Sequence, residues 1–232
     1  MDTCLQDAAS VLENERCTLE WVRNKTAKIR NLNDLFQSAE QAYYRFDASQ
    51  GMRVCLKWPV LHEVGNGNVL WIHIGGLIEL DNSTIENVTY YLCISREEQG
   101  SGKNRVLRKF HFDYANSAIR ESRRSSVFHL QYAGELPPEL KNEHDYDHLD
   151  PWFEEPRVFF LPMSLSLVLH MAFREFPDED TDKLCEDGYW RSRLVKRDEK
   201  YLIVPFLKEC LSVGEDKKKL LWDSACDPSP NS

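Results

Sequence analysis

Two short stretches of this sequence carry acidic, imidazole and amide side chains at alternate positions. The stretches are residues 109–114 and residues 126–132. In an extended strand every second side chain points to the same face, so each stretch would have one apolar and one polar face. If the two strands pair, their polar faces bring together four side chains, which are those of His111, Asp113, His129 and Gln131.

This group has the residue types of a hydrolytic site. A carboxylate beside an imidazole can orient the ring and raise its basicity. Two His and one Asp could also ligate a first-row divalent ion, although the sequence identifies neither a metal nor a cofactor. There are two alternatives for this group. It could be a binding site, or it could be a polar network that only stabilises the sheet. Arg157 opens the next apolar segment and could pair with Asp113. The candidate catalytic residues are therefore His111, Asp113, His129, Gln131 and Arg157.

Three other groups of residues are weaker candidates for a metal, catalytic or binding site. His144 and His148 are four residues apart, but Asp145 stands where a zinc protease has Glu, and we interpret the segment as a solvated acidic loop. Cys93 could meet a His on a neighbouring strand, His73, yet a buried thiol is the better interpretation. The linking segment before Ser126 contains three arginines that are either solvated or contact a phosphate or a partner. They are Arg120, Arg123 and Arg124.

Turn signals and hydrophobic spacing predict the elements that must position these residues. Residues 1–50 lack Gly and Pro and show helical spacing of apolar residues. Residues 51–134 alternate β-rich runs with turns, which predicts an antiparallel sheet of about five strands. We expect Pro59 to end the first strand and Gly75-Gly76 to bend or bulge the second. An acidic loop (135–156) and C-terminal helices (157–226) complete a single α+β domain, in which N-terminal and C-terminal helical layers flank the sheet.

Composition limits the class of protein and its partners. The chain has 232 residues, of which 42% are hydrophobic and 29% charged, as in an ordinary globular protein with one core. Its net charge of -9 disfavours nucleic acid as a partner of the whole molecule. Seven scattered Cys without a C-x-x-C pair indicate a reducing compartment. With neither a signal peptide nor a membrane span predicted, we expect a cytoplasmic protein.

Several of these segments resemble a family of uncharacterised bacterial proteins. The resemblance covers about residues 105–177 and depends on Phe112-Asp113-Tyr114, on the strand 126–130, and on an Arg before a Pro-led apolar helix ending near Phe176. The family is similar to small toxin-like proteins encoded near antiphage defence genes. Its recurring positions match Asp113, His129 and Arg157, and it implies a defence or toxin–antitoxin context without a catalytic mechanism.

Two functional hypotheses follow. The first is a bacterial accessory or effector protein of a defence or toxin–antitoxin-like system that acts through contacts with a protein partner. The second is a hydrolase, and a nuclease is the favoured kind. In it the His and Asp residues would act in general acid–base catalysis, and an Arg would stabilise the charge of the phosphate. A purely structural role for the polar group is the third alternative.

Overall fold

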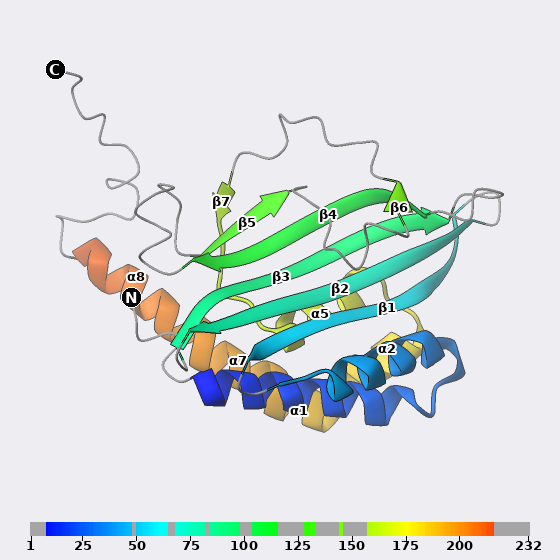
Figure 1. Ribbon diagram of the computed structural model, residues 1–232, viewed down its shortest axis with the longest axis horizontal. Helices are drawn as coiled ribbons and strands as arrows, with labels where there is room; N and C mark the ends of the chain where they lie inside the picture. Colours follow the sequence, from blue (N-terminus) through cyan, green and yellow to red (C-terminus); the bar gives the residue numbers. More distant parts are fainter. Residues whose placement is uncertain are drawn as a thin grey trace, which may run out of the picture.

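The predicted α+β class is confirmed by the computed structural model. It describes residues 8–47, 50–64, 68–81, 84–97, 104–115, 128–132, 144–145 and 157–215. Figure 1 shows a broad sheet with helices below and behind it. The N-terminal and C-terminal helices share one layer, because residues of both pack into the same hydrophobic core against one face of the sheet.

The helices fall into two groups along the chain. The N-terminal group is α1 (Ala8–Thr26), η1 (Arg30–Leu32) and α2 (Asn33–Tyr44). The C-terminal group is α5 (Leu165–Glu175), α6 (Glu179–Glu186), η3 (Trp190–Val195), α7 (Lys196–Asp198), η4 (Glu199–Ile203) and α8 (Val204–Glu215). Among the described residues, no helix is long and apolar enough to cross a bilayer.

Within the described residues, the sheet contains the five predicted strands and two short additional ones. They are β1 (Gly51–Val64), β2 (Asn68–Asp81), β3 (Thr84–Glu97), β4 (Asn104–Ala115), β5 (Phe128–Tyr132), β6 (His144–Asp145) and β7 (Arg157–Phe159). The strand order is β1-β2-β3-β4-β5-β7, with antiparallel neighbours throughout, and β6 pairs in parallel with β4. The segment 157–226 thus begins with a strand of the sheet and not with a helix.

Two details of the strand predictions are wrong. The first strand does not end at Pro59 but continues to Val64. An edge strand tolerates Pro because the N–H groups on its free side have no ladder partner. Gly75 and Gly76 also keep an unbroken register with β1 and β3, and the irregularities lie elsewhere.

The two glycines make room for tyrosine rings instead of forming a bulge. A Cβ on Gly75 would lie 2.0 Å from the ring of Tyr91, and one on Gly76 would lie 2.8 Å from the ring of Tyr90. Because successive side chains of β3 point to opposite faces, one ring covers each face of β2 at this point.

Aromatic side chains join the helical layer to the sheet. Trp58 of β1 packs against Phe173 of α5, with ring centroids 5.6 Å apart. Within the helical layer, Trp21 of α1 stacks on Trp190 of η3 at 4.4 Å. These contacts fix the N-terminal and C-terminal helices to each other and to one face of the sheet. The opposite face is not covered by these helices, and it carries polar residues.

Candidate functional site on the polar face of the sheet

The face of the sheet turned away from the helical layer carries the predicted site residues, and we call it the polar face. Strands β4 and β5 pair as expected, with His111 opposite Gln131 and Asp113 opposite His129. On the other side of β5, Arg157 of β7 stands opposite Gln131. Residues opposite each other lie about 5 Å apart between Cβ atoms, and successive rows about 7 Å apart. The register therefore brings all five candidates into two adjacent rows, which we call the two-row cluster.

The described side chains of the two-row cluster are half-buried. His111, Asp113 and Gln131 each keep part of their surface exposed. On its β3 side His111 faces Tyr91, with ring centroids 6.4 Å apart and planes inclined by 46°. Tyr91 is itself buried, because its ring lies across Gly75. His111 thus has the ring of Tyr91 on one side and the amide of Gln131 on the other. Neighbours on both sides restrict the orientation of the imidazole ring.

The next row of the polar face contains the Cys and His considered as a nucleophile pair. Cys93 lies directly opposite His73 on β2 and Lys109 on β4. The Cys93 side chain is fully buried, and this burial raises the pKa of the thiol to about 12 although the Lys109 charge lowers it. The His73 Nε2 atom lies 3.0 Å from the hydroxyl of Ser95. A thiol that stays protonated at neutral pH is a poor nucleophile, so Cys93 is best understood as a buried small residue.

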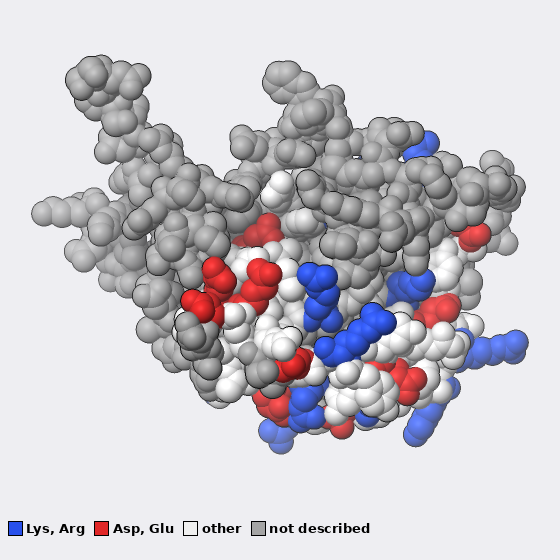
Figure 2. Space-filling view, in the orientation of Figure 1, with Lys and Arg blue, Asp and Glu red and all other residues white. Residues whose placement is uncertain are grey.

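The polar face has basic residues although the whole chain is acidic. Arg53 and Lys57 on β1 reach the surface of this face, whereas Lys109 on β4 is buried. The Lys57 ammonium lies 5.9 Å from the centre of the Trp71 ring. Figure 2 shows Lys and Arg side chains near the middle of the view and a group of Asp and Glu side chains to their left. A chain with net negative charge can therefore still present a locally basic surface to an anionic ligand.

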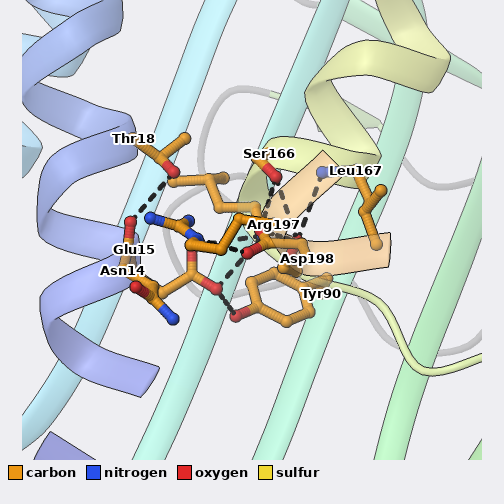
Figure 3. A network of polar contacts seen from close by, with 10 residues as sticks. Asn14, Glu15, Thr18, Tyr90, Ser166, Leu167, Arg197 and Asp198 are labelled. Atoms are coloured by element: carbon orange, nitrogen blue, oxygen red, sulfur yellow. Dashed lines mark hydrogen bonds and ion pairs between the residues drawn. The ribbon is translucent and has the colours of Figure 1, made fainter. Parts of the chain in front are cut away.

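A buried polar network lies on the other face of the sheet, between α1, β3, α5 and α7 (Figure 3), and it is absent from the predictions made from the sequence. The Tyr90 hydroxyl donates to Glu15 Oε1 at 2.5 Å, and the backbone N–H of Leu165 donates to the same carboxyl. Asp198 accepts hydrogen bonds from the hydroxyls of Ser164 and Ser166 at 2.7 and 2.6 Å.

Burial dominates the electrostatics of this network. Glu15 is 2% exposed, and burial raises the pKa of its carboxyl to about 8, with the charge of Asp198 adding to the effect. Glu15 is thus mainly neutral at pH 7, and it holds the first turn of α5 against α1. The sequence contained one signal of this arrangement, because Glu15 and Thr18 interrupt the apolar stripe that Leu12, Leu19 and Val22 form on α1.

The remaining sequence candidates have different outcomes. His144 is the first residue of β6 and pairs with Asn104, so this position is a strand and not part of a helix. His148 and the three arginines at 120, 123 and 124 lie outside the described residues. Within the described part of the chain, no three His, Cys, Asp or Glu side chains are placed to hold a metal ion.

Fold and site together define an α+β protein with one helical layer and a polar sheet face that carries a His/Asp cluster. Comparisons of the chain with protein-family models, with curated proteins and with solved structures find no match. A functional assignment therefore has to be argued from the geometry of the chain itself.

Proposed function

We propose that the two-row cluster is a hydrolytic site for phosphodiester substrates, in an effector protein of a defence or toxin–antitoxin-like system. The observation that supports this most is the register that places Asp113 opposite His129 and His111 in line with Gln131 and Arg157. Acid–base residues and a cation within one patch are the components that phosphodiester hydrolysis requires.

Each residue of the cluster has a role in the proposed reaction. His129, oriented by Asp113, takes a proton from the attacking water as the new P–O bond forms. His111, in its imidazolium form, gives a proton to the leaving oxygen as the other P–O bond breaks. Arg157 stabilises the negative charge that develops on the phosphoryl oxygens, and Gln131 orients the substrate between the two rows.

The charge of the polar face supports an anionic substrate. Arg53 is exposed and Lys57 half-buried on this face, and Lys109 is buried beneath it, while the chain as a whole carries a net charge of -9. Repulsion by the rest of the molecule should weaken binding of a long polyanion more than binding of a short one. We therefore expect oligonucleotides or nucleotides as substrates in preference to long duplex DNA.

The test is hydrolysis of bis(p-nitrophenyl) phosphate and of a fluorescent single-stranded oligonucleotide by the full chain. Asp113→Asn and His129→Gln should each reduce the rate roughly 100-fold or more, because each removes acid–base function from the transition state. Glu79→Gln, an exposed position on the same face outside the cluster, serves as the matched control. Absence of hydrolysis by the wild-type chain, or full activity in both folded variants, would contradict the proposal.

A second candidate function is action through protein contacts, and an exposed apolar surface on the C-terminal helix favours it. Four large apolar side chains there are accessible to solvent, and we call them the α8 stripe. They are Tyr201 (59% exposed) of η4, which directly precedes α8, and Val204 (42%), Leu207 (44%) and Leu211 (71%) of α8. Large apolar side chains gathered on one helix face are typical of an interaction surface.

Co-expression with the products of the neighbouring genes tests this second function. We expect a stoichiometric complex that Leu211→Glu abolishes, because a carboxylate at this position would have to be desolvated in the interface. Tyr44→Glu is the matched control, since Tyr44 is 73% exposed but lies on α2. A complex that survives Leu211→Glu would show that the α8 stripe is not the contact surface.

A further inference from the structure

The row of the two-row cluster that contains Asp113 continues across the sheet to the edge strand β1. Asp113 of β4 stands opposite Thr89 of β3. Leu77 of β2 stands between Thr89 and Arg53 of β1. Figure 1 shows these four strands side by side across the molecule. Neighbouring strands are about 4.8 Å apart, so the backbones of Asp113 and Arg53 are separated by about 14 Å. We call these four positions the Arg53 row.

The Arg53 row reaches the surface, whereas the row on the other side of the cluster is buried. The Arg53 side chain is exposed, and the other three members of its row are half-buried. Cys93 and Lys109 lie on the same face, but their exposed fractions are only 0% and 2%. An extended ligand bound at the cluster therefore has a path over the Arg53 row and none over Cys93 and Lys109.

The side chains along this path fit a single strand of nucleic acid. The Arg53 guanidinium can donate two hydrogen bonds to one phosphate. Leu77 supplies an apolar contact for a base or sugar, and the Thr89 hydroxyl can donate to a phosphate or sugar oxygen. In the next row outward, the exposed Glu79 accepts a hydrogen bond from the amide of Asn87 at 3.2 Å. The negative charge of Glu79 repels a second phosphate chain beside the first, which disfavours a duplex.

We infer that the Arg53 row binds a single-stranded oligonucleotide, with one phosphate at the two-row cluster and a second phosphate at Arg53. The inference rests on the proposed hydrolytic function and specifies its substrate. A length of about 14 Å corresponds to roughly four nucleotides when a strand is stacked at about 3.4 Å per nucleotide, and to fewer when it is extended. A dinucleotide, which has one phosphodiester, cannot contact both ends of the row, whereas a hexanucleotide can.

Fluorescence anisotropy of labelled oligothymidylates bound to the full chain tests the row. A His129→Gln background keeps the ligand intact. The dissociation constant should fall about tenfold from the dinucleotide to the hexanucleotide and by less than about twofold from there to the decanucleotide, because one charge-assisted contact is added. Arg53→Gln should abolish the gain and leave dinucleotide binding unchanged. It should also reduce the salt dependence of hexanucleotide binding by about 0.7 in the log–log slope, the value for one phosphate contact.

Lys57→Gln is the matched control for Arg53→Gln. Lys57 is a cation on the same strand and face, but it stands in the row of the buried Cys93 and Lys109 and not in the Arg53 row. This variant should keep the tenfold gain, and circular dichroism should show that both variants are folded. Weak or equal binding of all lengths, a gain that continues to the decanucleotide, or equal effects of the two substitutions would overturn the inference.

Binding and hydrolysis are scored separately, so the two proposals can fail independently. If the length gain depends on Arg53 but the wild-type chain hydrolyses neither test substrate, the hydrolytic function is excluded and the Arg53 row stands as a binding site. If the wild-type chain hydrolyses the substrates but shows no length gain, the hydrolytic function stands and the Arg53 row is excluded.

Discussion

Glu15→Gln should remove a large pH dependence from the folding stability of this protein. The carboxyl of Glu15 is buried between α1, β3 and α5, and its pKa is raised from 4.5 to about 8, mainly by burial. Glutamine has nearly the same shape and no charge, and its carbonyl oxygen can still accept from the Tyr90 hydroxyl. The substitution thus keeps the packing and removes the titration.

The sign and size of the effect follow from the pKa shift. Between pH 4.5 and pH 8 the folded chain holds a proton that the unfolded chain has released, so the unfolding free energy falls as the pH rises. The loss from this one group is about 3 kcal/mol at pH 7 and about 5 kcal/mol above pH 8, as an order-of-magnitude figure. Below pH 4.5 both states hold the proton and the group has no effect.

Urea unfolding followed by tryptophan fluorescence, at unit steps from pH 5 to pH 9, measures this effect. The wild type should lose unfolding free energy across the series relative to Glu15→Gln, and the difference should have the size given above. Glu86→Gln, an exposed position on the same strand as Tyr90, should follow the wild type. Parallel pH profiles for Glu15→Gln and the wild type would refute the reasoning, because they would show that Glu15 is not held neutral in the folded chain.

Three further predictions concern buried positions. Ser166→Ala removes a 2.6 Å hydrogen bond to Asp198, and it should lower the unfolding free energy by about 1–3 kcal/mol in the same urea assay. Gly75→Ala forces its new methyl group into the Tyr91 ring, and a loss of about 1–3 kcal/mol should appear as a lower melting temperature. Cys93 should resist alkylation by iodoacetamide in the folded chain, as measured by site-resolved mass spectrometry, because its thiol is buried and its pKa is about 12.

Local patterns in the sequence were sufficient for most of the fold. Alternation in residues 109–114 and around His129 predicted both strands and the side on which their polar residues lie, and the register confirms this arrangement. C-terminal helices were predicted within residues 157–226, and the first of them, α5, begins at Leu165 directly after the capping residue Ser164. The catalytic role of the two-row cluster stays a prediction, since register brings residues together without showing what they do.

The features that the sequence did not reveal depend on contacts between distant segments. Glu15 and Asp198 are separated by most of the chain, and local spacing cannot show that both are buried beside α5. β7 has only three residues, so the apolar run after Arg157 is too short to separate a strand from a helix start by periodicity. The predicted bulge at Gly75-Gly76 was wrong for the same reason. The glycines make room for the rings of Tyr90 and Tyr91, which lie on β3, and spacing within β2 cannot show this.

The two tyrosine rings over the paired glycines also limit how the β2–β3 hairpin can form. A slip of one residue in either direction would place one of the rings onto Ile74 or Leu77, where a side chain already fills the space. Only one alignment of the hairpin therefore lets both rings lie flat against the neighbouring strand. This steric selection should keep the long central strands from becoming trapped in misaligned intermediates, a hazard for any antiparallel sheet built from strands of this length.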